Sequence, residues 1–298
     1  MDIRILQHYL EFGTYTNPGP YEEVLRNDLP DGVREIGLRV RQSLIHRTTL
    51  AAGNTGTNAD LRYGDMTKVP WYRQPEDDIL VTAAAMLAEL YRRDSRGLVM
   101  DRDPANKLVL TCRFTAILMA SVLKSKNIPC RVRSGNAGYW GNTDEPDDSS
   151  GDHWVNQYWD SANGRWVTID VDGGLNVTRF DPYDIPEGRF DFPASTWLGV
   201  RSGTMDAQRF TYANGTRGTI VVLWALFYDF HSLMNSEIIY LHRPIYGASK
   251  RFANLTPDEL EKIDSLARLM LDPDGNFDEL QALWETERDF RLLKGGLL

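Results

Sequence analysis

Leu108-Val109-Leu110-Thr111-Cys112-Arg113-Phe114-Thr115-Ala116 is the segment that decides the expected fold. The apolar run before Thr111 predicts a short strand, and the apolar spacing over 111–126 predicts a helix that begins at the cysteine. This helix should end at Asn127-Ile128-Pro129, because a residue before proline avoids the helical region. Unpaired N–H groups and the dipole at a helix start favour a thiolate, which is a nucleophile. The alternative interpretation of Cys112 is a small buried core residue.

Two polar residues downstream complete a possible catalytic set. A strand is predicted over 153–160 and a hairpin partner over 165–170, so antiparallel pairing would bring Asp170 beside His153. A histidine next to a thiolate stabilises it and protonates the leaving group, and a carboxylate orients the imidazole. The alternatives are a histidine on a surface strand and an aspartate that forms the turn before Val171-Asp172-Gly173-Gly174.

The order of these features resembles the transglutaminase-like superfamily, which includes transglutaminases, peptide N-glycanases and many bacterial amidases or proteases. Four segments carry the resemblance over roughly residues 105–175, namely Cys112-Arg113-Phe114-Thr115-Ala116, Asn127-Ile128-Pro129-Cys130-Arg131-Val132-Arg133-Ser134-Gly135, Asp152-His153-Trp154-Val155-Asn156 and Arg165-Trp166-Val167-Thr168-Ile169-Asp170.

This resemblance implies an α+β fold with a papain-like/transglutaminase-like core, in which the nucleophile helix packs on an antiparallel sheet. It also implies a catalytic triad of Cys112, His153 and Asp170. An upstream side chain often joins the backbone N–H of the nucleophile as an oxyanion donor, and Trp71 and Gln74 are the candidates by position. The alternative for both is ordinary loop packing or solvation. No cofactor and no metal are expected.

The expected reaction is cysteine-dependent acyl chemistry on an amide through a thioester. Water as the second reactant gives an amidohydrolase or protease, and an amine acceptor gives a transglutaminase; the substrate would be a peptide, a protein or a small amide. Leu110, where the family often has glycine, favours a second hypothesis, a catalytically inactive binding protein. A third is a metal site, because Cys112, His153 and Asp170 are possible zinc ligands, although no Cys-x-x-Cys or His-x-x-x-His pair supports it.

The rest of the chain is predicted to add helices to one domain over 1–298. The catalytic core would cover about 60–190, with a helical N-terminal extension over 1–59, a helical C-terminal extension over 217–298 and the best linker candidate at 190–216. Helical patterns cover 21–46, 77–93, 219–234, 256–271 and 277–293, and 51–75 reads as a long loop. The loop Asp144–Asp152 is acidic, and its interpretations are a solvated loop, attraction of a cationic substrate or a calcium site.

The composition of the chain argues against some classes of binding partner. The net charge of −9 argues against nucleic-acid binding and against docking on an anionic membrane. Two cysteines are too few for a disulfide scaffold. No signal peptide is visible, and the longest apolar run, 220–233, is too short to span a bilayer, so a cytoplasmic location is expected.

Overall fold

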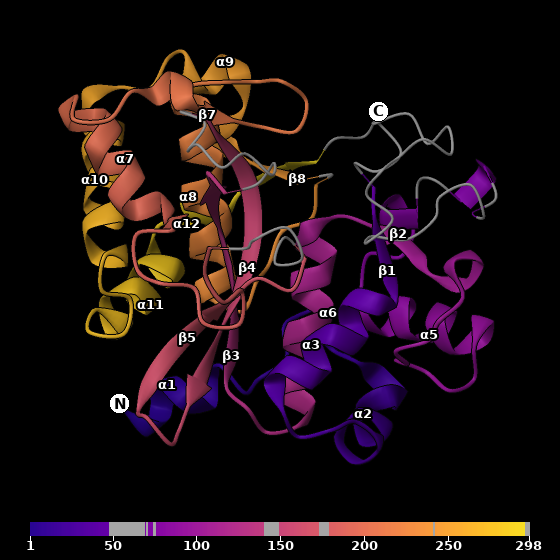
Figure 1. Cartoon of the computed structure of the whole chain (residues 1–298). Coiled ribbons are helices and arrows are strands. Elements are labelled where there is room, and N and C mark those ends of the chain that lie inside the picture. The colour runs from indigo at the N-terminus through magenta and orange to yellow at the C-terminus, as the bar shows by residue number, and fades with distance from the viewer. Residues whose placement is uncertain are drawn as a thin grey trace. The chain divides into compact units, whose positions relative to one another are not determined.

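The structure is a computed structural model that describes residues 1–47, 69, 71–73, 76–139, 149–172, 179–240 and 242–295. Its fold is α+β, with helices and short strands along the described chain (Figure 1). The chain forms two compact units. The first holds Met1–His8, Val132–Trp154 and Pro186–Leu298, and the second holds Tyr9–Arg131 and Val155–Ile185. The single domain with a core over about 60–190 stays a prediction.

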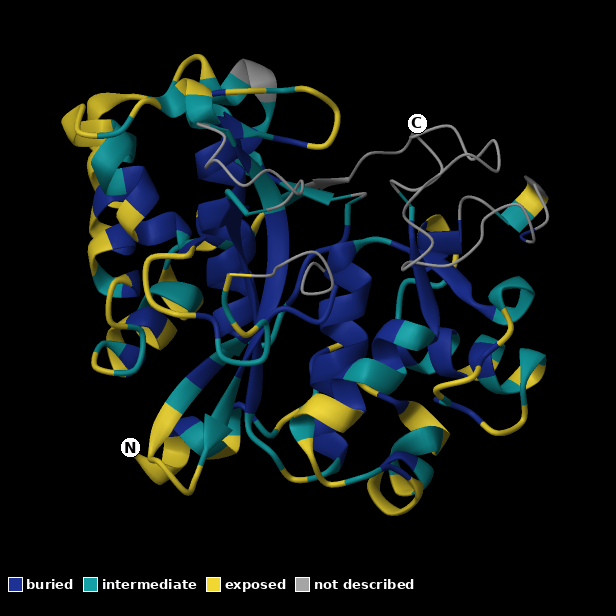
Figure 2. Ribbon diagram, in the orientation of Figure 1, coloured by how far each residue is buried: buried dark blue, intermediate teal, exposed yellow. Residues whose placement is uncertain are grey.

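Helix α6 (Cys112–Ser125) is the buried centre of the second unit. All 14 of its residues are buried, and the helix is drawn dark blue in Figure 2. A helix that is buried on every side needs neighbours all round. These are α2 (Glu22–Asp28), α3 (Val33–Gln42) and α5 (Ala83–Arg93). The predicted helix over 111–126 is confirmed, and it ends where Asn127 adopts a left-handed φ of 58°.

A two-stranded parallel sheet leads into this helix. Strand β1 (Leu44–His46) pairs with β2 (Leu108–Leu110), and His46 lies opposite Leu110. The strand predicted before the cysteine is therefore confirmed. The helical pattern predicted over 21–46 is wrong at its end, where the chain becomes a strand. Three buried residues have no periodicity of their own, and only the distant partner strand makes them extended.

The predicted hairpin is also confirmed. Strand β4 (Ser150–Asp160) pairs antiparallel with β5 (Arg165–Ile169), from Asn156 opposite Ile169 to Asp160 opposite Arg165. In the turn between them Gly164 has a φ of 63°, a conformation that favours glycine. The sheet has the order β5-β4-β3-β6 with β7 beside β4, where the further strands are β3 (Cys130–Ala137), β6 (Phe190–Asp191) and β7 (Phe210–Thr211).

Helix α7 (Pro193–Ser202) packs against both α8 (Thr219–Leu233) and α10 (Pro257–Met270) in the first unit. Trp197 of α7 donates its indole N–H to Asp264 of α10 at 2.7 Å. The linker predicted over 190–216 is wrong, because α7, β6 and β7 lie within it. Other α-helices and strands of this unit are α1 (Ile3–His8), β8 (His242–Pro244), α9 (Ser249–Phe252), α11 (Phe277–Thr286), α12 (Arg288–Arg291) and β9 (Leu293–Gly295).

Two C-terminal predictions have different outcomes. The capping box predicted at Thr256 is present, since its side chain and that of Glu259 each accept from the other residue's backbone N–H. The helix predicted over 277–293 is interrupted at Glu287, so that α11 and α12 are separate. Within the described ranges, no helix has the length and apolar character needed to cross a bilayer.

Candidate active site

Cys112 is the first residue of α6, as predicted. Its side chain is 5% exposed. Thr111 caps the helix with an extended backbone and makes no side-chain cap hydrogen bond. The positive end of a helix dipole favours the thiolate form of a cysteine, so this position suits a nucleophile. The other thiol, Cys130, is buried in β3 and accepts a hydrogen bond from the amide of Asn156 at 3.7 Å.

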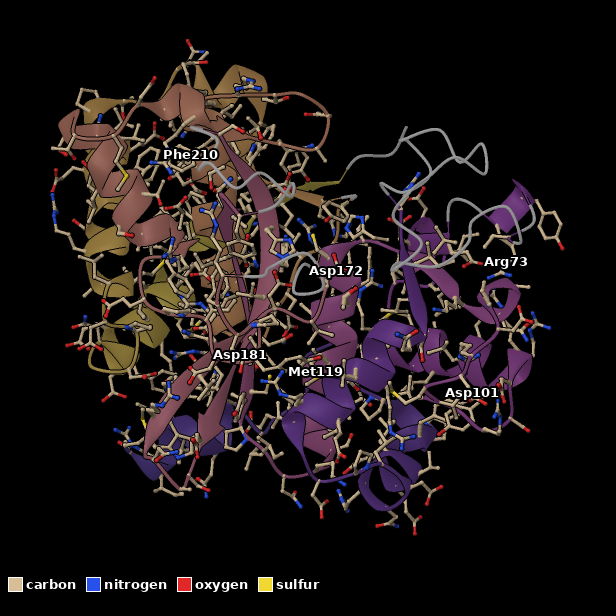
Figure 3. All side chains as sticks on the ribbon, viewed as in Figure 1. Arg73, Asp101, Met119, Asp172, Asp181 and Phe210 are labelled. Atoms are coloured by element: carbon tan, nitrogen blue, oxygen red, sulfur yellow. The ribbon has the colours of Figure 1, made fainter. Side chains whose placement is uncertain are left out.

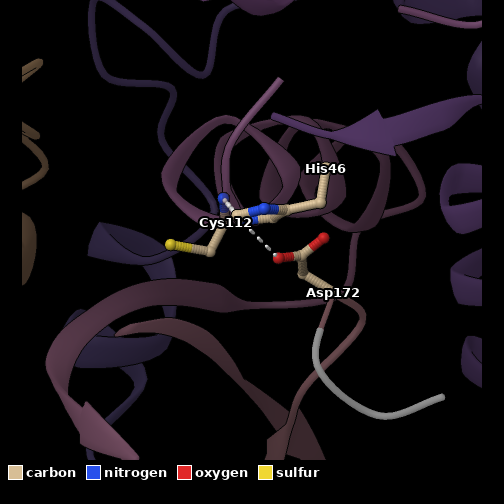
Figure 4. Close-up of side chains that lie close together, drawn as sticks. All are labelled: His46, Cys112 and Asp172. Atoms are coloured by element: carbon tan, nitrogen blue, oxygen red, sulfur yellow. Dashed lines mark hydrogen bonds and ion pairs between the residues drawn. The ribbon is translucent and has the colours of Figure 1, made fainter. Parts of the chain in front are cut away.

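His46 is the histidine that lies beside Cys112 within the second unit. The backbone N–H of Cys112 donates to its Nε2 at 3.2 Å (Figure 4). The parallel pairing of β1 with β2 causes this contact, because it sets His46 opposite Leu110, two residues before the cysteine. The pairing continues past the strand end, where Arg47 N–H donates to the carbonyl of Leu110 at 2.8 Å. The imidazole is therefore held by a hydrogen-bonded backbone.

Asp172 supplies a carboxylate to the same cluster. It follows the end of β5, and its Oδ2 lies 3.1 Å from His46 Nε2. Asp172 is 2% exposed and His46 is 6% exposed. One side-chain donor atom from each of His46, Cys112 and Asp172 lies within 4.8 Å of the others. Figure 4 shows the His46 ring between the backbone nitrogen of Cys112 and the Asp172 carboxylate, while the Cys112 sulfur points to one side.

The protonation of His46 decides which of its two contacts is a hydrogen bond. A neutral Nε2 accepts from the Cys112 N–H, whereas a protonated Nε2 donates to Asp172 and no longer accepts. Burial lowers the pKa of His46, but the Asp172 charge and Cys112 outweigh it and raise this pKa above its ordinary value of 6.5. Near neutral pH the ring is therefore more often an imidazolium held against Asp172 than an isolated buried histidine would be.

The predicted triad residues are distributed between the two units. Cys112 and Asp170 belong to the second unit, and His153 belongs to the first, where it is 1% exposed and its ring meets that of Tyr139 edge-on at 6.4 Å. Asp170 accepts a hydrogen bond from the backbone N–H of Asp172 at 3.0 Å, which is the turn-forming role considered from sequence. Assembly of Cys112, His153 and Asp170 into one triad stays a prediction.

The structure describes only some residues of the predicted oxyanion donors and of the acidic loop. Trp71 lies in the short helical turn η4 (Trp71–Arg73). Gln74 and the stretch 144–148 lie outside the described residues. The oxyanion role and the interpretations of the loop stay predictions.

Sequence reasoning missed His46 and Asp172 as site residues. The signal for His46 was weak, because Leu44-Ile45-His46 continues a helical pattern and only its pairing with β2 reveals a strand. For Asp172 a signal was present. It is a second aspartate just after the predicted strand, two residues beyond Asp170.

Comparisons with known proteins add little to this geometry. No protein-family model matches the chain, and no curated protein matches it. One similar solved structure is that of a protein from Cytophaga hutchinsonii named "Putative Cysteine Protease", at 13% identity and a TM-score of 0.36. The similarity covers 64% of this chain and 46% of that one, so the chain spans under half of that protein's length.

Proposed function

We propose that this protein is an enzyme of papain-like/transglutaminase-like architecture that uses Cys112 as a nucleophile against an amide carbonyl. The observation that carries this proposal is the cluster of thiol, imidazole and carboxylate at the N-terminus of a buried helix. These three groups are the ones that thiol acyl chemistry uses. The α+β fold and the resemblance over residues 105–175 agree with it.

In the proposed reaction the Cys112 thiolate attacks the carbonyl carbon and forms a C–S bond. The tetrahedral intermediate then loses its amine, which takes a proton from an imidazolium, and a thioester remains. Water or a second amine attacks this thioester and releases the thiolate. Water makes the protein an amidohydrolase or protease, and an amine makes it an acyltransferase. The proposed substrate is a peptide, a protein or a small amide.

Two histidines compete for the role of proton carrier. His153 is proposed from the resemblance, with Asp170 to orient it. His46 is proposed from the geometry, because its Nε2 lies against Asp172 and close to Cys112. In the first case the His46 ring would position the start of the helix, and in the second it would exchange the proton itself.

Alkylation of Cys112 by iodoacetamide distinguishes these roles. Labelling is measured against pH in a Cys130→Ser background, so that only Cys112 reacts. His46→Ala and His153→Ala are compared with His242→Ala, a matched control in β8. The variant that removes the activating imidazole should label at least about tenfold more slowly near neutral pH, since general base catalysis contributes about 10²–10⁴-fold. The control should follow the wild type.

Equal and slow labelling of all forms would refute a histidine-activated thiolate and favour a binding protein. If labelling is fast, the second half of the reaction is tested with a panel of peptide amides, with and without a fluorescent primary amine. Incorporation of the amine identifies a transferase, and release of ammonia or an amine without incorporation identifies a hydrolase. Cys112→Ser should abolish both.

A further inference from the structure

We propose that His46, Cys112 and Asp172 also form a binding site for a divalent transition metal of the zinc class. Thiolate sulfur, imidazole nitrogen and carboxylate oxygen are all ligands that Zn²⁺ accepts. The three come from β1, from the start of α6 and from the segment after β5, all within the second unit (Figure 4). The proposed site shares Cys112 with the Cys112–His153–Asp170 set considered from sequence, and it takes His46 and Asp172 in place of the other two.

The separation of the donor atoms suits such an ion. With metal–ligand bonds of about 2.0–2.3 Å, two ligands of a tetrahedral ion lie about 3.3–3.7 Å apart. His46 Nε2 and Asp172 Oδ2 are 3.1 Å apart, and all three donor atoms lie within 4.8 Å of one another. A shift of about 1 Å, within reach of side-chain rotation alone, gives three ligands of a tetrahedral set. The fourth position would hold water, as in zinc sites that bind substrates.

Besides the separation of the donor atoms, the burial of the Asp172 carboxylate supports a metal site. Asp172 is 2% exposed, and His46 Nε2, 3.1 Å from its Oδ2, is the group that lies against this carboxylate. Its Oδ1 has no hydrogen-bond partner among the described residues. A buried carboxylate with so few hydrogen-bond donors is costly unless a cation compensates it. A divalent ion between Asp172 and His46 would compensate the buried negative charge of Asp172 more fully than a single imidazolium does.

The elements that carry the ligands are held in place. His46 lies on β1, whose pairing with β2 continues through Arg47 N–H to the carbonyl of Leu110 at 2.8 Å. Asp172 donates its backbone N–H to Asp170 Oδ1 at 3.0 Å. Supported ligands lose less conformational freedom when an ion binds, and this favours binding.

Metal binding would regulate the proposed chemistry, and this consequence rests on the proposed function. Binding of Zn²⁺ forms bonds to the Cys112 sulfur and to His46 Nε2, and any proton on either atom leaves to solvent, without any change of oxidation state. The sulfur would then be a ligand and no longer a free nucleophile. Zinc should therefore suppress the acyl chemistry reversibly, and a chelator should restore it.

The test uses the full chain after removal of metal with a chelator. Zn²⁺ affinity is measured by competition with a chromophoric chelator, and Co²⁺ reports sulfur ligation through its thiolate charge-transfer absorption. Wild type and Cys130→Ser should bind one equivalent with this absorption, and Cys112→Ser should lack it. His46→Ala and Asp172→Asn should bind at least about tenfold more weakly, because even outer partners of a ligand change affinity about 10–100-fold.

A further measurement needs no variant, in case a substitution prevents folding. One equivalent of Zn²⁺ should protect Cys112 of the wild type from iodoacetamide, and EDTA should reverse the protection. Absence of binding by the wild type, or wild-type affinity in both His46→Ala and Asp172→Asn, would overturn the metal site. The two proposals fail separately: an inert thiol in a protein that still binds Zn²⁺ refutes only the enzyme, and a reactive thiol that Zn²⁺ leaves unprotected refutes only the metal site.

Discussion

Replacement of Glu76 by alanine is expected to loosen the strand that leads into Cys112. Glu76 is 5% exposed. Its Oε1 accepts from Arg73 Nε and from Arg93 Nη2, each at 2.6 Å, and its Oε2 accepts from the backbone N–H of Val109 in β2 at 2.7 Å. Figure 3 labels Arg73, which comes from the turn η4 (Trp71–Arg73). One carboxylate thus joins two cations to the strand that ends just before the nucleophile helix.

The expected effect is large because alanine leaves the donors of Arg73, Arg93 and Val109 without this acceptor. Removal of one partner from a buried ion pair costs about 3–5 kcal/mol, and an unsatisfied buried N–H costs about 1–3 kcal/mol. Part of this is recovered, since both arginines also donate to the carbonyl of Lys107. We expect a local loss of about 4 kcal/mol, which corresponds to about a 10³-fold increase in the opening equilibrium of β2.

Hydrogen exchange measured by mass spectrometry on peptides that cover 104–112 tests this value. Glu76→Gln should lie between wild type and Glu76→Ala, because its amide oxygen still accepts one donor. Glu89→Ala is the matched control. Glu89 also accepts from Arg93, at 2.7 Å, but its side chain is 19% exposed, so its loss should cost less than about 1 kcal/mol. A change below about fivefold in the Glu76→Ala peptides would show that Glu76 does not hold β2 in place.

Three predictions concern the first unit. Burial lowers the pKa of His231 to about 4, so the folded protein keeps the ring neutral while the unfolded chain is protonated below its ordinary pKa of 6.5. Stability should therefore fall by up to about 3 kcal/mol as pH falls from 6.5 to 4, and His231→Asn should remove this slope in urea unfolding. Asp229 accepts from Arg133 at 2.8 Å through both oxygens, and Asp229→Ala should cost about 3–5 kcal/mol in the same assay. Thr256→Ala, which removes the cap of α10, should cost about 1 kcal/mol, detected as faster exchange in its first turn.

The parts of the fold that sequence predicted are those with local signals. The helix that begins at Cys112 has apolar residues all along it and a proline just after its end. The hairpin has a turn with Gly164, and α10 begins with Thr256-Pro257-Asp258-Glu259. Strand β1 has no such signal. Its three residues pair with β2 far along the chain, and the preceding helix hides the change of conformation.

The residues of the candidate site also differ in whether the local sequence predicts them. Cys112 could be found because a strand and a helix meet at it in the sequence. His46 could not, since its neighbour in space is set by the pairing of β1 with β2. The choice between Asp170 and Asp172 also needed structure, because both stand just after the strand in sequence and only the structure shows that the Asp172 carboxylate lies against His46.

These two aspartates form one turn, and this affects how any substitution in it is interpreted. The side chain of Asp170 accepts the backbone N–H of Asp172, whose own carboxylate lies against His46. Asp170→Ala would remove that acceptor and displace Asp172 as well, so a loss of activity would not identify a triad aspartate. Asp170→Asn keeps an oxygen for the same N–H and removes only the charge. Activity lost in Asp170→Asn therefore points to orientation of a histidine by Asp170, whereas activity lost only in Asp170→Ala points to the turn that places Asp172 beside His46.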